Sequence, residues 1–146
     1  MGVSLCKANL EDAMIIHEMQ VNSFMPLLEK YQDYDTNPAN EPLERIITRL
    51  NQPFTDYYLI KYFGDTVGGI RIVKLGNKSY RVSPIFILPE YQGKGIAQKV
   101  FERIEQIYPN EDLWELDTIM QEEWLCYLYE KLGNKKKKKK KKINNN

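Results

Sequence analysis

The sequence predicts a single-domain α/β protein of the α+β type, in which helices flank a mixed, mostly antiparallel sheet. Its 146 residues suit one domain built around one hydrophobic core. Two helical patterns come early in the chain, and three strand-like runs joined by short turns follow them. A further helix, strand and helix complete the pattern. This order of elements is typical of helices packed in layers on a sheet.

The N-terminal part of the chain predicts one strand and two helices. The apolar run from Val3 to Ala8 predicts the strand, and Asn9 can cap a helix that begins at Leu10. Pro42 suits the first turn of a second helix, which Pro53 ends. The apolar face of the first helix is expected to contain Leu10, Ala13, Met14, His17, Val21, Phe24 and Leu28. The apolar residues of the second helix are Leu43, Ile46, Ile47 and Leu50.

Three runs rich in Tyr, Ile, Val and Phe predict an antiparallel meander. The turn signals Gly64-Asp65 and Gly76-Asn77 separate these runs. Pro84 lies inside the third run and has no amide hydrogen, so we expect a bulge or an unpaired side at that position. The three predicted strands are Tyr57 to Phe63, Thr66 to Lys74 and Ser79 to Ile87.

The rest of the chain predicts a helix, a fifth strand and a last helix. Pro109 ends the first of these helices, and Leu113 to Thr118 alternates as a strand should. Gln121 to Leu132 predicts the last helix, and Gly133 suits its C-terminal cap. The apolar face of the helix before Pro109 is expected to contain Ile96, Val100, Phe101, Ile104 and Ile107.

Composition and charge narrow the class of function. The run from Lys135 to Lys142 supplies eight of the 21 basic residues; without it, 13 basic residues would face 20 acidic ones. An acidic body argues against a nucleic-acid partner, which needs clustered Lys and Arg. No apolar run approaches the roughly 18 residues that cross a bilayer, and Met1 to Lys7 lacks the pattern of a signal peptide. We therefore expect a cytoplasmic protein without a membrane partner.

The two cysteines do not predict a metal site or a disulfide. Cys6 and Cys126 lie far apart in the sequence, and neither has a Cys or His neighbour at metal-ligand spacing. We expect both to be reduced packing residues, and we expect no bound metal.

Two glycines, Gly93 and Gly95, lie where a predicted strand gives way to a predicted helix. Glycine lets the backbone turn tightly and approach a ligand closely, while the amide groups and dipole of a first helical turn favour an anion. A diphosphate could bind there. The segment is neither a Walker motif, which needs Lys followed by Ser or Thr, nor the Gly-x-Gly-x-x-Gly fingerprint of dinucleotide folds.

This segment resembles the coenzyme motif of the GNAT superfamily of N-acetyltransferases. That motif has Gln or Arg, two residues, Gly, one residue, and then Gly or Ala, and Gln92, Gly95 and Ala97 match it. Pro89-Glu90-Tyr91 and the late segment Leu128 to Gly133 are also similar to the family's pattern. The resemblance covers the element order of most of the chain. It implies a GNAT-like fold in which two central strands splay apart.

The resemblance implies that the chain binds acetyl-CoA between the splayed strands. Backbone groups of one strand would pair with the pantetheine amides, and the glycine turn with the following helix would hold the pyrophosphate. The alternative is a tight turn whose glycines serve packing alone. The implied coenzyme-binding residues are Ile85, Phe86, Ile87, Gln92, Gly93, Lys94, Gly95, Ile96, Ala97 and Gln98.

The resemblance also implies an enzyme that transfers acetyl directly to a primary amine in a ternary complex. The acceptor would be a small-molecule or peptide amine, in a pocket formed by the first two helices and the segment Tyr31 to Asn40. Tyr129 stands at the family's tyrosine position and would protonate the departing thiolate, because a phenol with a pKa near ~10 keeps its proton at neutral pH. Alternatively, Tyr129 packs with Trp124 and Leu125.

The general base is left open by the sequence. Several carboxylates could lie near the splayed strands, and a chain of water molecules could act instead. The only histidine, His17, lies on the apolar face of the first helix, which favours a packing role. The candidate carboxylates are Glu90, Glu115, Asp117 and Glu122.

The C-terminal part departs from the family's pattern. Glu122 stands where many relatives have Asn, and Asn134 leads into the lysine run. We therefore assign residues 1–134 to the GNAT-like acetyltransferase domain and residues 135–146 to a lysine-rich tail, an artefact or a remnant of truncated final strands. Eight like charges repel one another and are poor material for a strand. Without a strand there, an open sheet edge would leave room for a homodimer.

These departures favour two alternative functions. One is a catalytically inactive GNAT-like domain that binds acyl-CoA as a sensor or assembly module. The other is an adaptor whose basic tail binds a membrane or a nucleic acid.

Overall fold

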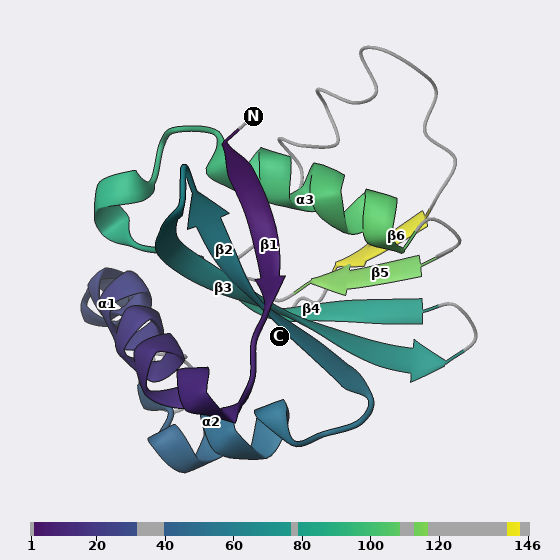
Figure 1. Ribbon diagram of the computed structural model, residues 1–146, viewed down its shortest axis with the longest axis horizontal. Coiled ribbons are helices and arrows are strands. Elements are labelled where there is room, and N and C mark those ends of the chain that lie inside the picture. The colour runs from purple at the N-terminus through teal and green to yellow at the C-terminus, as the bar shows by residue number, and fades with distance from the viewer. Residues whose placement is uncertain (1, 32–39, 77–78, 109–112, 117–139, 144–146) are drawn as a thin grey trace.

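The computed structural model describes residues 2–31, 40–76, 79–108, 113–116 and 140–143 of the chain (Figure 1). These residues form one sheet in the order β1-β2-β3-β4-β5-β6, with three α-helices and two short 3₁₀ turns. The helical elements are η1 (Leu10–Asp12), α1 (Ala13–Tyr31), α2 (Leu43–Leu50), η3 (Pro89–Tyr91) and α3 (Ile96–Ile107). The strands are β1 (Val3–Lys7), β2 (Thr55–Tyr62), β3 (Asp65–Gly76), β4 (Ser79–Ile87), β5 (Leu113–Leu116) and β6 (Lys140–Ile143).

The sheet is mixed and mostly antiparallel, as predicted. Strands β1 to β4 pair antiparallel with their neighbours, whereas β5 pairs parallel to β4 and β6 parallel to β5. Helices α1 and α2 cover one face of the sheet and α3 covers the other (Figure 1). The predicted last helix, Gln121 to Leu132, and the end of the predicted fifth strand lie outside the described residues.

The predicted turn between β2 and β3 is confirmed. Tyr62 pairs with Asp65, so Phe63 and Gly64 form a two-residue loop. Both have a positive φ, 50° and 91°. A two-residue hairpin turn of this kind needs positive φ at both positions, and glycine adopts it without steric cost.

The predicted bulge at Pro84 is also confirmed. Ile70 pairs with Ile85 and Ile72 pairs with Val82, so two residues of β4, Ser83 and Pro84, stand opposite one residue of β3. The Ser83–Pro84 peptide bond is cis. Because proline has no amide hydrogen, the ladder of backbone hydrogen bonds is interrupted at this point.

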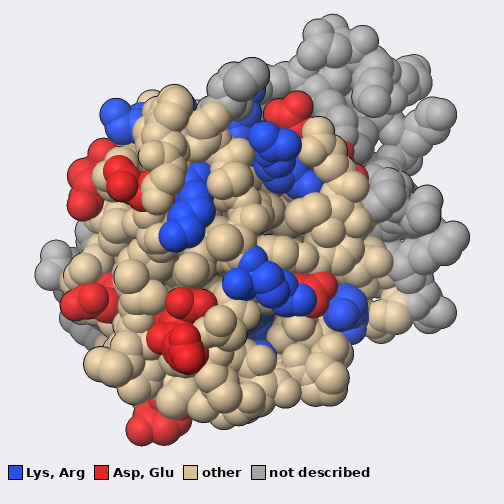
Figure 2. Space-filling model, in the orientation of Figure 1, with Lys and Arg blue, Asp and Glu red and all other residues tan. Residues whose placement is uncertain are grey.

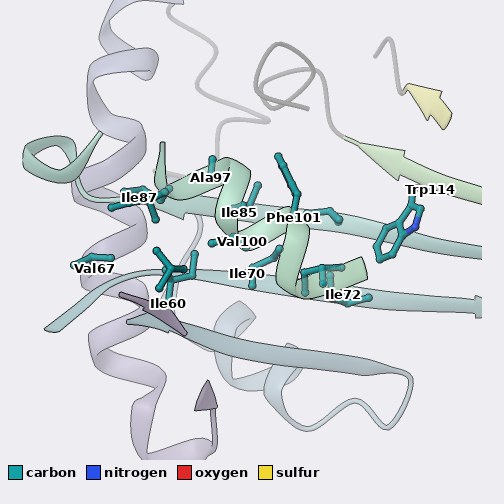
Figure 3. Packing of buried hydrophobic residues seen from close by; sticks show 14 residues of the cluster. Ile60, Val67, Ile70, Ile72, Ile85, Ile87, Ala97, Val100, Phe101 and Trp114 are labelled. Carbon is teal, nitrogen blue, oxygen red and sulfur yellow. The ribbon is translucent and has the colours of Figure 1, made fainter. Parts of the chain in front are cut away.

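Each face of the sheet has its own hydrophobic cluster. Under α3, side chains of β1 to β5 meet the inner face of the helix, and Figure 3 shows Ala97, Val100 and Phe101 of α3 together with Ile85 and Ile70 of the sheet. Under α1 and α2, the cluster contains Ala13, Ile16, Met19, Phe24, Ile46, Tyr57, Leu59 and Phe86. Alternate residues of β4 therefore serve different clusters, as the pleat of a strand requires.

The predicted apolar face of α1 is partly wrong. Leu10 and Met14 are 51% and 73% exposed, and buried positions are taken instead by residues that include the polar Gln20 and Ser23. Residues 10–12 form a 3₁₀ turn, capped by Asn9 as predicted, so the α-helix starts at Ala13 with a different phase. The helix before Pro109 has the predicted buried face except at Ile107, which is 44% exposed.

The expectation that the lysine run cannot form a strand is wrong for its last part. Lys140–Ile143 forms β6 and pairs with Leu113–Leu116 of β5. Ladder hydrogen bonds involve only the backbone, and lysine is common on edge strands because its charge prevents further pairing. The side of β5 that we expected to be open is therefore paired.

Charged side chains of both signs are interspersed on the face shown in Figure 2. Among the described residues, no helix is long and apolar enough to cross a membrane. Within the same residues, no group of three or more His, Cys, Asp and Glu side chains is placed to bind a metal ion.

A polar cluster joins the C-terminal end of α3 to β1 and β2. The Tyr108 hydroxyl donates to Asp56, and Lys7 donates to the same carboxylate at 3.1 Å. Burial alone would raise the pKa of Asp56, but the hydrogen bonds from Tyr108 and Lys7 and the charges of Lys7 and Lys74 together lower it below 3.8. A lowered pKa means that the folded state binds a proton at Asp56 less readily than the unfolded state.

We expect Asp56→Asn to reduce the acid sensitivity of folding. The stabilisation by the Asp56 carboxylate is present above its unfolded pKa of about 3.8 and is lost as the pH falls through the lower folded pKa. Urea unfolding should therefore show a loss of roughly 1 kcal/mol or more for the variant at pH 7, and a smaller difference from wild type at pH 3. Asp65→Asn, in the exposed β2–β3 turn, is the control and should behave like wild type at both pH values.

Candidate coenzyme site

The end of β4 leads through η3 and two glycines into α3. Gly93 and Gly95 have φ angles of 80° and 77°, in the left-handed region that other residues rarely adopt. Gly95 is the N-terminal cap residue of α3, and within the described part of the chain no side chain caps this end of the helix. The N–H groups of a first helical turn point out of the helix end without intrahelical partners. This end of α3 therefore offers hydrogen-bond donors and the positive end of the helix dipole.

The space around these glycines argues against a packing role. A Cβ atom added to Gly93 would meet no atom within 4 Å, and one added to Gly95 would meet only Gln98 Oε1 at 3.8 Å, as far as the described residues show. In contrast, a Cβ on Gly68 in β3 would lie 2.1 Å from the Phe86 carbonyl oxygen. Gly68 is thus required by packing, whereas Gly93 and Gly95 leave a surface that a ligand can approach.

The first turn of α3 packs on the sheet, and the residues just before it are exposed. Ile96 and Ala97 are buried in the cluster under α3, at 2% and 6% exposure. Gln92, Gly93, Lys94 and Gly95 are exposed. Lys94 adds a positive charge next to the helix end, which suits a phosphate group.

The backbone N–H and C=O groups of successive β4 residues point alternately toward β3 and away from it. The Leu88 amide donates to the Val67 carbonyl at 2.8 Å, and in an antiparallel ladder such pairs recur at every second residue. The backbone groups of Phe86 therefore face β3. Those of Ile85 and Ile87 face away from β3, and we call them the Ile85–Ile87 edge.

The Ile85–Ile87 edge follows the last described pair between β4 and β5. Within the described residues, β4 pairs with β5 only from Ser79↔Leu113 to Val82↔Leu116, which ends just before the bulge. Gln92, the first residue of the motif, folds back, and its Nε2 donates to the Ile87 carbonyl at 2.8 Å. The loop before α3 is thereby attached to the end of this edge.

Two of the predicted coenzyme-binding residues, Phe86 and Gln92, make their contacts with other parts of the protein. Phe86 has its backbone toward β3, and its ring packs edge-on against Phe24 of α1 with centroids 6.1 Å apart. Gln92 has its amide group bound to the chain itself. Ile85, Ile87 and the residues from Gly93 to Gln98 lie together around the end of β4 and the start of α3.

Only some of the residues predicted for catalysis and for the acceptor pocket lie among the described residues. Tyr129, its alternative packing partners Trp124 and Leu125, and the carboxylates Asp117 and Glu122 lie outside the described residues, as does most of the segment Tyr31 to Asn40. Glu90 is exposed in η3. Glu115 accepts a hydrogen bond from Arg81 at 3.1 Å. The His17 ring is hydrogen-bonded through Nε2 to the Glu41 carbonyl at 2.8 Å, which joins α1 to the start of α2.

A buried polar group behind the bulge was not predicted from the sequence. Arg71 in β3 is only 9% exposed and donates to the carbonyl oxygen of Ser83. Tyr57, directly opposite in β2, is 2% exposed, and burial raises the pKa of its phenol. A signal was present, because Arg71 is the one charged residue within the apolar run from Val67 to Val73.

Comparison with known proteins agrees with this fold. Residues 21–133 match the model of the Acetyltransferase (GNAT) family. The chain therefore belongs to the GNAT family of acetyltransferases, as the resemblance of its glycine motif implied. No curated protein sequence matches the chain.

Solved structures of acetyltransferases share the fold. The spermidine N-acetyltransferase of Vibrio cholerae, solved with CoA and spermine, is 18% identical with a TM-score of 0.64, covering 90% of this chain and 80% of that one. An aminoglycoside acetyltransferase from an uncultured soil metagenomic sample is 17% identical, with a TM-score of 0.58 and full coverage of both chains. The PaiA N-acetyltransferase of Thermoplasma acidophilum, solved with coenzyme A, is 14% identical, with a TM-score of 0.60 and coverage of 75% and 73%.

Proposed function

We propose that this protein is an acetyl-CoA-dependent N-acetyltransferase that transfers acetyl to a primary amine by direct attack in a ternary complex. The observation that carries the proposal is the uncapped start of α3, with Gly93 and Gly95 in left-handed conformations and open space around both. Its position beside the Ile85–Ile87 edge supports a ligand with a diphosphate at one end and an amide-containing arm at the other.

The residues present fit coenzyme A. The first-turn amides of α3 and the Lys94 side chain would hold the pyrophosphate, because an uncapped helix start attracts anions. The outward backbone groups of Ile85 and Ile87 would pair with the two pantetheine amides as a strand pairs with its neighbour. In this arrangement Phe86 supports the site through α1, and Gln92 fixes the loop, rather than contacting the pantetheine arm.

The chain's own residues would then catalyse the transfer of the acetyl group to the amine. When bound, acetyl-CoA supplies an activated thioester. The protein must hold the amine in its neutral form and provide a proton for the departing thiolate. We propose Tyr129 as that proton donor, and one of the nearby carboxylates or a water chain as the base. The acceptor would be a small-molecule or peptide amine.

A direct assay tests the proposal. The protein is incubated with acetyl-CoA and a panel of primary amines that includes spermidine, an aminoglycoside and short peptides, while free thiol is measured. We expect thiol release that depends on at least one amine. Calorimetry with CoA is run in parallel. Binding of CoA without thiol release for any amine would favour the sensor alternative, and absence of binding to folded protein would overturn the proposal.

Gly95→Leu should weaken CoA binding at least about tenfold. The side chain would occupy the open space beside the helix start, and the positive φ would disfavour the present backbone conformation. Gly76→Leu is the matched control, since Gly76 also has a positive φ, 86°, and open space around it but lies at the end of β3. Both variants should lose similar thermal stability, and equal CoA affinities in the two would contradict the role of Gly95.

Tyr129→Phe should slow turnover by about 100-fold or more, the usual contribution of a general acid. The Kd for CoA should stay within about twofold of the wild-type value, because the phenol acts on the leaving group rather than in coenzyme binding. Tyr80→Phe, which keeps the ring stacked on Trp114 at 5.2 Å, is the control and should retain activity. An unchanged kcat for Tyr129→Phe would remove this residue from the mechanism.

A further inference from the structure

Arg71 is an unusual residue for the middle of β3. It is 9% exposed, while its sequence neighbours Ile70 and Ile72 are fully buried in the cluster under α3. Because side chains alternate along a strand, Arg71 lies on the opposite face, toward α1 and α2. Burying a guanidinium costs several kcal/mol unless hydrogen bonds compensate. Its partners therefore indicate what the residue does.

The Arg71 guanidinium joins two distant parts of the chain. Nη1 donates to the backbone carbonyl of Ser83 in the bulge of β4. Nη2 lies 3.5 Å from Oε1 of Gln52, in the segment between α2 and β2. Tyr57 stands directly opposite Arg71 in the register of β2 and β3 and is itself buried. The side chain is thus held from two directions, and it reaches the bulge from the face covered by α1 and α2.

The contact falls at the position where the regular ladder fails. Between the pairs Ile72↔Val82 and Ile70↔Ile85, Ser83 and Pro84 stand opposite Arg71 alone. A bulge changes the twist and direction of a strand, and the backbone groups within it lose their regular partners. The Arg71 side chain supplies a hydrogen bond to the Ser83 carbonyl at this point. Arg71 therefore stands opposite the bulge in the β3–β4 ladder and also binds the bulge through its side chain.

The bulge decides where the Ile85–Ile87 edge points. The last described pair between β4 and β5 is Val82↔Leu116, immediately before Ser83. Ile85 follows Ser83 by two residues and Ile87 by four. A strand that lost its bulge would shift by one residue, which would turn the outward groups of Ile85 and Ile87 toward β3.

We propose that Arg71 is a positioning residue, which fixes the bulge at Ser83 and so sets the direction of the Ile85–Ile87 edge for coenzyme binding. The inference rests on the proposed function, since it gives that edge its role. Arg71 does not touch the coenzyme in this account. It acts through the backbone of β4, from the other face of the sheet.

Calorimetry with CoA and hydrogen exchange of the free protein test this inference on Arg71→Met and Arg71→Lys. Methionine keeps much of the volume and removes every donor, so the Kd for CoA should rise about tenfold or more. Amides of residues 83–88 should also exchange faster than in wild type, while those in α3 should not. Lysine keeps the charge but offers one ammonium in place of a two-armed guanidinium. It should give intermediate values in both measurements.

Arg49→Met is the matched control. Arg49 is also a largely buried arginine, and its guanidinium is bound to both carboxylate oxygens of Glu41 at 2.7 and 2.9 Å. Its loss should lower the melting temperature because the Glu41 carboxylate loses both hydrogen bonds from the guanidinium and keeps only the contacts with Gln20 and Arg45 among the described residues. Binding of CoA should stay within about twofold of wild type, since the Arg49 guanidinium, among the described residues, is bonded to Glu41 and not to the bulge. A general loss of stability is thereby separated from positioning.

The outcomes are distinct. Should the wild-type protein itself not bind CoA, the proposed function fails. Faster exchange of residues 83–88 in the Arg71 variants would then still support the conclusion that Arg71 fixes the bulge at Ser83. Should wild type bind CoA and Arg71→Met bind it equally well, the inference on Arg71 fails alone. If Arg71→Met does not fold, Arg71→Lys decides: values equal to wild type in both affinity and exchange would overturn the inference.

Discussion

Pro84 has no amide hydrogen, so the backbone ladder between β3 and β4 cannot continue through it. The structure resolves this with a bulge in which two residues of β4 stand opposite Arg71. The last described pair between β4 and β5, Val82↔Leu116, lies at the same level of the strand. Beyond the bulge, the backbone groups of Ile85 and Ile87 face away from β3. The geometry of the site follows from this one interruption, because β4 runs from the bulge to Ile87 and α3 starts only nine residues later, at Ile96.

The uncapped start of α3 is stable because packing outweighs the missing cap. A side-chain cap contributes about 1 kcal/mol. Five residues of α3 are buried against the sheet, and each large apolar side chain contributes roughly 1.5 to 3 kcal/mol when fully buried. The helix can therefore leave its first amide groups uncapped by side chains without being destabilised overall. The two glycines serve the same end, since their left-handed conformations place no side chain over these amides.

The two faces of the sheet have different tasks in this arrangement. The face under α3 is entirely apolar in its main cluster and fixes the helix on which the diphosphate would bind. The face under α1 and α2 combines an apolar cluster with buried polar residues, including Gln20, Ser23 and Arg71. Identities below 20% with acetyltransferases of similar fold show that the common scaffold tolerates wide change in sequence.

The sequence by itself determined the features that depend on one residue's backbone chemistry. The missing amide hydrogen of Pro84 predicted the bulge, and Gly93 and Gly95 predicted a tight turn at a helix start, where the structure has both in the left-handed region. Only the tertiary structure decided which side chains are buried and what they contact. Leu10 and Met14 fit a helical pattern but are exposed, Lys140–Ile143 forms a strand because β5 offers a backbone partner, and Arg71 finds Ser83 and Gln52, which lie 12 and 19 residues away. A φ preference or a missing donor acts within one or two residues, whereas burial and pairing depend on segments that meet only after folding.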